Sequence, residues 1–295
     1  MIFITGATGG FAGTVIQDAL TLIPAGERLV VGTRNPESQA ARKIASTHGI
    51  DVRRVDFDAP ATLATAFSGV TKVLIVPTTA SNDVRFTQNS NAIRAAQAAG
   101  VRHVIYASFI NAGATSLIEH NQKVHGPTER FLRESGLTYT ILRHGLYAEI
   151  ILGDLEQTLA SGRFRRGGDD MPTALISRRD LARSAASVLT HDGHENRIYT
   201  ETAPQAVRNS EIASIIAEVF GKPVVHENLS EAEWVEYAHA VLGMPRELAL
   251  SSVGTMRAIA GGEFNVVTDD YHSITGRPAR SVRQFLQDFR QSKTG

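Results

Sequence analysis

The sequence of 295 residues contains no cysteine. Disulfide bonds, thiolate-bound metals and a cysteine nucleophile are therefore excluded, and any metal would have to be bound by histidine and carboxylate side chains. The chain also has no excess of charge of either sign, because 30 Lys and Arg residues balance 30 Asp and Glu residues. This balance gives no overall attraction to nucleic acid or to an anionic membrane surface, so we expect neither as a partner.

Long hydrophobic runs are absent too. The strongest apolar stretch, at residues 73–76, has the length of a strand and is far shorter than the roughly 18 residues of a membrane helix. The first six residues have a strand pattern rather than that of a signal peptide. We therefore expect a cytoplasmic protein, and a content of 42% hydrophobic and 20% charged residues is typical of a globular chain.

Short β-branched runs alternate with Ala-rich amphipathic stretches over the first 145 residues. We expect strands at residues 2–5, 29–33, 52–55, 73–76, 104–107 and 139–142, and helices at residues 10–22, 36–48, 61–67, 85–99 and 122–135. Strict alternation implies parallel strands joined by right-handed crossovers. The predicted fold class is α/β, with a doubly wound parallel sheet of the Rossmann type.

The alternation ends after residue 147. Helices are expected at residues 153–161, 179–189, 210–220, 230–242, 246–260 and 281–290, short strands at 197–199 and 224–226, and a Gly-rich polar stretch at 162–170. We therefore predict a nucleotide-binding domain over residues 1–147, to which residues 177–200 return. Residues 148–295 are predicted to form mainly a smaller, mostly helical substrate domain that caps it.

A glycine-rich turn, GATGGFAG at residues 6–13, directly follows the first strand and opens the first helix. Its Gly-x-x-Gly-x-x-Ala spacing is related to the dinucleotide-binding fingerprint. Glycines at these positions let the turn close and let the backbone approach a pyrophosphate at the helix N-terminus. The turn predicts a dinucleotide site, the alternative being a tight connection that holds no ligand.

The end of the second strand bears on the choice of nucleotide. An Asp or Glu there binds the ribose hydroxyls of NAD, whereas an Arg accommodates the 2′-phosphate of NADP. The strand ends at Thr33 and Arg34 with no acidic residue, which predicts NADPH in preference to NADH. The alternative is that Arg34 is an exposed residue at a helix start. After the third strand, Phe57 between two aspartates predicts either an adenine contact or a solvated turn.

The Tyr-Lys pair that many alcohol dehydrogenases use for proton transfer is absent, because no tyrosine is followed by lysine four residues later. A quinone fits this gap, since its reduction gives a hydroquinone anion far less basic than an alkoxide, and water can complete the protonation. Hydrolase and P-loop motifs are absent as well. The His-rich turn at residues 191–195 resembles a solvated turn more than a metal site, so no metal is predicted.

Loose motifs occur in a specific order over nearly the whole chain: ITGATG at 4–9, VRHVIYAS at 101–108, VHGPTE at 124–129, TYTILR at 138–143, SRRDLA at 177–182 and GRP at 276–278. In this order they resemble the NmrA-like atypical short-chain dehydrogenases/reductases, of the NAD(P)H:quinone oxidoreductase 2 and triphenylmethane reductase type. The resemblance implies a Rossmann domain that binds NADP(H), a small C-terminal substrate domain, and reduction of quinones or similar conjugated acceptors.

Carried over by position, the resemblance also implies site residues. The pyrophosphate would be bound by Gly6, Thr8, Gly9, Gly10 and Phe11, the 2′-phosphate by Thr33 and Arg34, the adenine region by Phe57, the ribose and nicotinamide by Val76, Pro77 and Thr78, and the nicotinamide side by Ser108, Phe109 and Tyr147. The acceptor would meet Tyr147 and His125, with Ser108 and Lys123 behind them.

Each acceptor residue has a plainer alternative role. Tyr147 could pack between domains, His125 could cap a helix, and Lys123 could be solvated. Two departures from the family pattern bear on the site: Ala12 stands where a glycine is usual, and Gly126-Pro127 is expected to interrupt the helix that carries His125.

Two functions remain open from sequence. One is an NADPH-dependent reductase of a small, quinone-like acceptor. The other is a non-catalytic NADP(H)-binding redox sensor or regulator of the NmrA type, which would also lack a proton-transfer pair. The neutral charge and the lack of a nucleic-acid-binding module count against a regulator. An isomerase or sugar-nucleotide enzyme fits less well, because such enzymes usually retain Tyr-x-x-x-Lys. We expect a monomer or homodimer.

Overall fold

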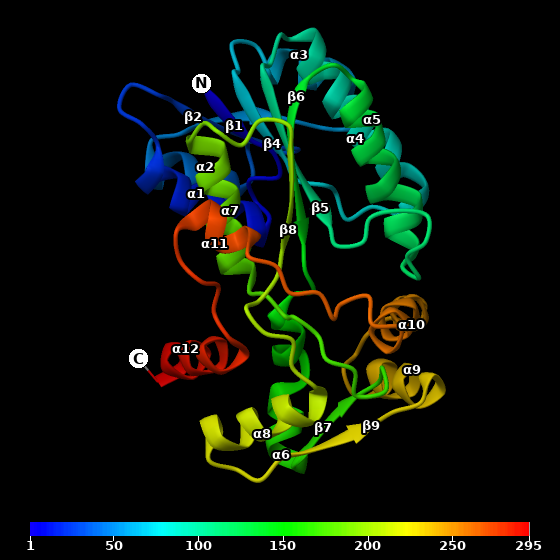
Figure 1. Cartoon of the computed structure of the whole chain (residues 1–295). Coiled ribbons are helices and arrows are strands. Elements are labelled where there is room, and N and C mark those ends of the chain that lie inside the picture. Colours follow the sequence, from blue (N-terminus) through cyan, green and yellow to red (C-terminus); the bar gives the residue numbers. More distant parts are fainter. Residues whose placement is uncertain (295) are drawn as a thin grey trace. The chain divides into compact units, whose positions relative to one another are not determined.

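The computed structural model describes residues 1–294 of the chain (Figure 1). The chain forms two compact units. Unit 1 comprises residues 1–114, 120–143 and 181–200, and unit 2 comprises residues 115–119, 144–180 and those from 201 onward.

Seven strands form one sheet, most of which belongs to unit 1. They are β1 (Ile2–Ile4), β2 (Leu29–Thr33), β3 (Asp51–Arg54), β4 (Lys72–Ile75), β5 (His103–Phe109), β6 (Thr138–His144) and β8 (Arg197–Glu201), in the order β3-β2-β1-β4-β5-β6-β8. Strand β1 pairs in parallel with both β2 and β4, so Phe3 lies opposite Val30 on one side and Val73 on the other. The predicted Rossmann-type α/β fold is confirmed. The strand order reverses between β1 and β4, which is where such sheets bind ligands at their carboxyl ends.

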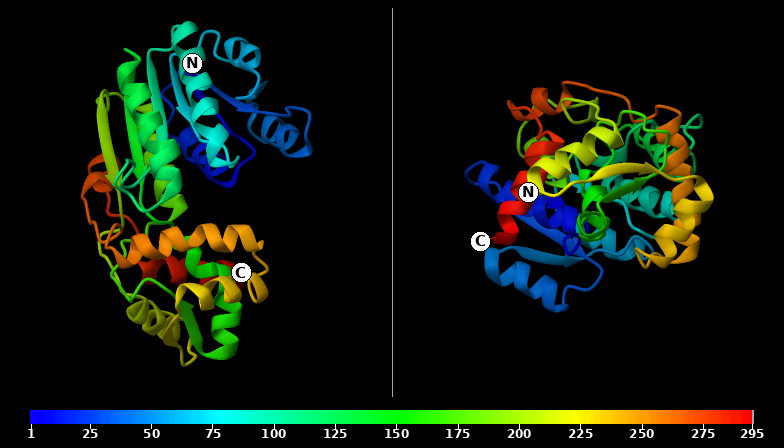
Figure 2. Two further views of the ribbon diagram at one scale, coloured as in Figure 1. Left: turned by 90° about the vertical axis from the view of Figure 1, so that its right-hand side faces the viewer. Right: turned by 90° about the horizontal axis from the view of Figure 1, so that it is seen from below.

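Helices cover both faces of this sheet (Figures 1 and 2). On one face lie α3 (Pro60–Ala66), α4 (Asn82–Ala98) and α5 (Gly126–Glu134), and on the other lie α1 (Gly10–Leu22), α2 (Gln39–His48) and α7 (Arg178–Thr190). Between the sheet and the first group is an apolar core, in which the rings of Phe3 and Phe67 pack edge to face at 5.4 Å. This core fixes the strand ends and therefore the loops that follow them.

The predicted interruption at Gly126-Pro127 is wrong, because the chain stays helical through it. A π-helical turn, η1 (Asn121–His125), precedes α5, and Pro127 lies in the first turn of α5. The wider π turn accommodates the proline ring, which would clash with a carbonyl in a regular α-helix. Glycine is required before it, since a Cβ on Gly126 would lie 2.9 Å from the Cα of Gly113.

Unit 2 contains η2 (Ala148–Asp154), α6 (Leu155–Ser161), β7 (Arg163–Arg166), α8 (Asn209–Phe220), β9 (Val225–Asn228), α9 (Glu231–Ala240), α10 (Arg246–Ala260), α11 (Asp270–Thr275) and α12 (Val282–Thr294). Strands β7 and β9 pair in parallel. The sequence indicated a polar loop where β7 lies, but Phe164 and Arg166 alternate inward, and Asp154 neutralises the buried Arg166 through two hydrogen bonds of 2.6 and 2.7 Å. Among the residues that the structure describes, no helix has both the length and the apolar character needed to cross a membrane.

Candidate functional site

The glycine turn between β1 and α1 has the conformation that a dinucleotide site requires. Gly6 has a φ of 69°, a left-handed conformation that L side chains rarely adopt. The Ala7 N–H donates to the Gly32 carbonyl of β2 at 2.9 Å, and the Gly9 N–H donates back to the Gly6 carbonyl at 2.8 Å. These bonds hold the turn against the carboxyl ends of the strands.

The N-terminus of α1 fits a pyrophosphate. Its N-cap residue is Gly9, which offers no side chain to the first N–H groups of the helix, and these have no partner within the helix. A Cβ added at Gly10 would meet no atom within 4 Å, so the space beside the helix start is open to a ligand. Phe11 follows in the same turn, half-buried. Ala12 is fully buried, so its methyl group points into unit 1 and leaves this space clear.

The end of β2 lies beside this turn. The hydroxyl oxygens of Thr8 and Thr33 are 3.4 Å apart. Arg34, the next residue, is exposed, and among residues 1–294 its guanidinium has no ion pair or hydrogen bond. Arg54 is also exposed and ends β3 directly opposite Thr33. A free guanidinium next to the glycine turn suits a phosphate monoester, which it can bind in a bidentate manner.

Phe57 lies deeper than a ligand contact would require. Its side chain is 5% exposed and belongs to the apolar core. The neighbouring Asp58 is exposed and accepts a hydrogen bond of 2.8 Å from the Gln88 amide, whose oxygen accepts from the Thr78 hydroxyl. The loops after β3 and β4 are thus joined through Gln88, and adenine could approach their polar edge rather than the buried ring.

The loop after β4 also meets the glycine turn. The Thr5 hydroxyl accepts from the Val76 N–H at 2.9 Å and donates to the Leu74 carbonyl. Val76 lies in contact range of a Cβ at Gly6, and Pro77 follows it half-exposed. Residues 76–78 therefore line the switch point between β1 and β4.

At the carboxyl end of β5, Ser108 takes part in a buried ion-pair network. Its hydroxyl donates to Glu129 Oε1 at 2.7 Å, and Arg143 donates to both Glu129 oxygens, from Nε at 2.9 Å and Nη2 at 2.6 Å. Glu129 is 2% exposed, and its hydrogen bonds raise the pKa of Arg143. Because the Ser108 proton is committed to Glu129, this hydroxyl can accept a hydrogen bond from a ligand but has no proton to give.

His125 lies on η1 with its ring against Phe109, the last residue of β5, at a centroid distance of 6.3 Å. Its Nδ1 is 2.9 Å from the hydroxyl of Tyr106, which is fully buried, and burial raises the pKa of that phenol. Lys123, on the same turn, is exposed. His125 and Ser108 are therefore both at the carboxyl end of β5.

Residues 6–192 match the protein family described as NAD(P)H-binding, which is more than half of the chain. The chain belongs to the NAD(P)H-binding family. Its members' cofactor fits the turn at Gly6 to Gly10, where the open helix start and the free Arg34 offer partners for phosphate groups.

Several relatives show which members of the family this NAD(P)H-binding protein is similar to. Quinone oxidoreductase 2 of Escherichia coli strain K12 is 35% identical over 268 residues, which cover 90% of each chain. An NmrA-like family domain-containing oxidoreductase of Aspergillus flavus is 32% identical over 300 residues, which cover 97% of this chain and 95% of the relative. The crystal structure of Citrobacter sp. triphenylmethane reductase complexed with NADP(H) has a TM-score of 0.91 and 32% identity, covering 99% of this chain and 100% of that chain. The predicted NmrA-like family and oxidoreductase class are confirmed.

Tyr147 belongs to unit 2 of this NAD(P)H-binding protein. Its hydroxyl is 3.3 Å from His144 Nδ1, and the Arg178 guanidinium lies 5.5 Å from the centre of its ring. Burial raises the pKa of the Tyr147 phenol to about 12, so its hydroxyl keeps its proton at neutral pH. The group is thus a hydrogen-bond donor and not a base.

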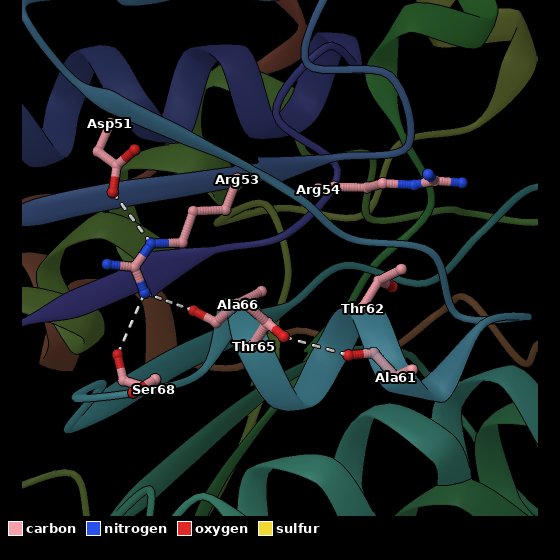
Figure 3. Close-up of a pocket in the computed structure, with 8 residues that line it drawn as sticks. All are labelled: Asp51, Arg53, Arg54, Ala61, Thr62, Thr65, Ala66 and Ser68. Atoms are coloured by element: carbon pink, nitrogen blue, oxygen red, sulfur yellow. Dashed lines mark hydrogen bonds and ion pairs between the residues drawn. The ribbon is translucent and has the colours of Figure 1, made fainter.

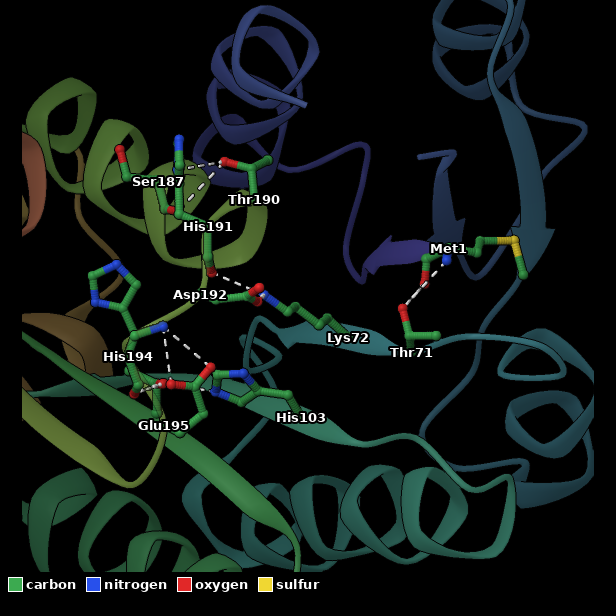
Figure 4. A network of polar contacts seen from close by, with 12 residues as sticks. Met1, Thr71, Lys72, His103, Ser187, Thr190, His191, Asp192, His194 and Glu195 are labelled. Atoms are coloured by element: carbon green, nitrogen blue, oxygen red, sulfur yellow. Dashed lines mark hydrogen bonds and ion pairs between the residues drawn. The ribbon is translucent and has the colours of Figure 1, made fainter. Parts of the chain in front are cut away.

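Two further groups of polar residues form hydrogen bonds that hold structural elements together. A pocket of about 670 Å³ along β3 and α3 contains Arg53, which donates to the carbonyls of Ala66 and Ser68 and to Asp51 (Figure 3). At the amino end of β4, Lys72 donates to the carbonyl of His191 and to Asp192, which fastens the turn at residues 191–195 to the start of this strand (Figure 4).

The sequence assigned no role to three residues that the structure places around the predicted ones. Asn89 and Tyr106 contact each other beside His125, and Glu129 binds Ser108. A signal existed for each: Asn89 is polar within an Ala-rich helix, Tyr106 is polar within a strand, and Glu129 follows His125 by one helical turn.

Proposed function

We propose that this NAD(P)H-binding protein is a reductase that prefers NADPH and transfers hydride to quinones or similarly conjugated acceptors without a Tyr-Lys pair. The observation that carries the proposal is the state of the hydroxyl groups around the carboxyl end of β5. The Ser108 hydroxyl donates its hydrogen bond to Glu129, and Tyr106 is buried with a raised pKa, so neither can act as a base or strong acid. Such a site suits an acceptor whose reduced form is a weakly basic anion.

The relatives support the same class of acceptor. Quinone oxidoreductase 2 and triphenylmethane reductase are named for quinones and for triphenylmethane dyes, which are conjugated compounds. NADPH, when bound, would supply the hydride, and the balanced reaction would consume NADPH, quinone and one proton and yield NADP⁺ and hydroquinone.

The chain's own residues would bind and orient the nucleotide and the acceptor. Gly6 and Gly9 close the turn, the start of α1 at Gly10 offers backbone N–H groups to the pyrophosphate, and Arg34 pairs with the 2′-phosphate. His125 donates a hydrogen bond to the acceptor oxygen on which negative charge develops, which stabilises the product anion.

Ser108, Lys123 and Tyr147 are the further proposed acceptor contacts. Ser108 can accept a hydrogen bond from a hydroquinone hydroxyl, Lys123 is exposed with a cationic end, and Tyr147 keeps its hydroxyl proton. Bulk water completes protonation of the hydroquinone anion, so none of the three needs to transfer a proton.

Steady-state oxidation of NADPH and NADH against benzoquinones and naphthoquinones tests the proposal. We expect saturable, enzyme-dependent turnover with a higher kcat/KM for NADPH than for NADH. Tight NADPH binding with no turnover above background for any acceptor would refute the reductase and favour the non-catalytic sensor.

A further inference from the structure

Arg54 is the last residue of β3, the strand at the edge of the sheet. In the parallel pairing of β2 with β3 it lies directly opposite Thr33. Directly paired residues of neighbouring strands lie about 4.8 Å apart and project from the same face of the sheet. The Thr33 hydroxyl is 3.4 Å from that of Thr8 in the glycine turn. Arg54 therefore projects from the face of the sheet at which the glycine turn meets β2.

Its neighbour Arg53 projects from the opposite face and has a structural role. The Arg53 guanidinium donates to Asp51 and to the carbonyls of Ala66 and Ser68. Arg54 is exposed, and among residues 1–294 its guanidinium has no hydrogen bond or ion pair. In Figure 3 its side chain extends away from Arg53 and from α3, in the direction in which the strand runs. That direction leads to the carboxyl ends of the strands, where sheets of this kind bind their ligands.

Two guanidinium groups without a partner among residues 1–294 thus lie close together. Arg34 comes one residue after Thr33, which puts its Cα roughly 6 Å from that of Arg54. The two aspartates that follow β3 bind elsewhere, since Asp56 accepts from the Asp58 N–H, and Asp58 accepts from a glutamine of α4. Two like charges at this spacing repel each other unless an anion lies between them. The pair therefore points to an anionic ligand.

The charge of the pair matches one particular group of the nucleotide. A phosphate monoester has two negative charges above its second pKa of about 6, whereas each phosphate of a dinucleotide pyrophosphate has one. One guanidinium neutralises half of the charge of the monoester, and two neutralise it fully.

We propose that Arg54 is a second specificity-determining residue for NADPH, which binds the dianionic 2′-phosphate together with Arg34. This inference rests on the NADPH preference of the proposed function. It adds a residue from a different strand, because Arg54 ends β3 whereas Arg34 follows β2.

Nucleotide titrations of the full-length protein test the assignment. In Arg54→Gln, which keeps most of the side chain and removes the charge, the Kd for NADPH should rise about 5- to 20-fold. The Kd for NADH, which lacks the 2′-phosphate, should change less than about twofold. An unchanged Kd for NADPH, or equal losses for both nucleotides, would overturn the inference.

Three further variants define the role of the charge. Arg54→Lys keeps the charge but loses the bidentate geometry, so it should restore part of the affinity for NADPH. Arg102 is equally exposed but precedes β5, at the amino ends of the strands, and Arg102→Gln should leave both Kd values unchanged. The double variant Arg34→Ala/Arg54→Gln should bind NADPH and NADH with equal Kd values. If Arg34→Ala keeps a preference for NADPH that Arg54→Gln does not reduce further, Arg54 does not bind the phosphate.

Phosphorus-31 NMR of bound NADP⁺ reads the phosphate itself. Two guanidinium groups favour the dianion, so the pKa of the bound 2′-phosphate should lie below its free value of about 6. In Arg54→Gln this pKa should move back toward the free value, and in Arg102→Gln it should stay as in the unsubstituted protein. A 2′-phosphate pKa that is the same with and without Arg54 would overturn the inference.

The proposed function and this inference fail in different ways. Absence of turnover with any acceptor refutes the reductase, and the titrations and spectra with NADP(H) then still decide the role of Arg54. Equal Kd values for NADPH and NADH in the unsubstituted protein refute both the proposed preference and the role of Arg54. A preference for NADPH that depends on Arg34 but not on Arg54 refutes the inference alone.

Discussion

Arg34→Ala removes the side chain that we propose binds the 2′-phosphate of NADPH. Arg34 is exposed and has no carboxylate partner among residues 1–294, so its loss should change the free energy of unfolding by no more than about 0.5 kcal/mol. A hydrogen bond to a charged group contributes about 1.5–3 kcal/mol, and each 1.4 kcal/mol is a factor of ten in Kd. We therefore expect the Kd for NADPH to rise about 10- to 100-fold, and the Kd for NADH, which lacks this phosphate, to change less than about twofold.

Arg28→Ala is the matched control. Arg28 and Arg34 are both exposed and flank β2 at its two ends. The five residues of β2 lie between them, and six steps along an extended chain separate them by roughly 20 Å, more than twice the Debye length of about 8 Å at physiological salt. Removal of the same charge at Arg28 should thus leave the NADPH Kd almost unchanged.

Fluorescence titration of both nucleotides measures these constants, at 0.15 M and again at higher salt. The NADPH preference should shrink as salt rises, because the guanidinium is exposed and is screened. Equal losses for NADPH and NADH in Arg34→Ala, or an equal NADPH loss in Arg28→Ala, would refute the assignment.

Three further predictions concern the turn, the ion pair and a buried histidine. Gly10→Ala should weaken NADPH binding in titrations without loss of stability, because a Cβ there meets nothing in the protein, whereas Gly6→Ala should also lower the melting temperature because of its positive φ. Glu129→Ala leaves the Arg143 guanidinium without its carboxylate partner. The free energy of unfolding from urea denaturation should therefore fall by about 3 kcal/mol, whereas Glu134→Ala, at an exposed position of the same helix, should change it very little. Burial lowers the pKa of His103 to about 4, below its unfolded value near 6.5, so protonation favours the unfolded chain. The free energy of unfolding should have its full value above pH 6.5 and fall by about 3 kcal/mol as the pH drops to 4. His103→Asn should make the free energy of unfolding less dependent on pH in this range.

Local signals predicted most of the elements. Helix α1 (Gly10–Leu22) and helix α10 (Arg246–Ala260) begin and end at the predicted residues, because a glycine turn in one case and a proline in the other lie next to an unbroken apolar period. Strand β7 (Arg163–Arg166) was missed, because its two inward residues include an arginine that only a distant aspartate makes suitable for burial.

At Gly126-Pro127 the sequence predicted a break in the helix that the structure does not have. Proline and glycine together indicate a break, and no local pattern announces the π turn that absorbs them. The close approach of Gly113, which makes glycine necessary at this position, depends on a loop that follows another strand. The conformation of Gly126 and Pro127 therefore depends on tertiary packing and could not be predicted from the residue types.

By itself, the sequence determined the alternating α/β architecture, the glycine turn from Gly6 and the presence of Arg34 at the end of the second strand, since each depends on residues within a few positions of one another. Only the tertiary structure decided that the Ser108 hydroxyl donates a hydrogen bond to Glu129 and that the Tyr106 hydroxyl lies 2.9 Å from His125 Nδ1. These bonds join residues about 20 positions apart, on a strand and on the helical segment that follows it. Whether these groups meet depends on how the helical segment packs against the strand, which spacing along the chain does not determine.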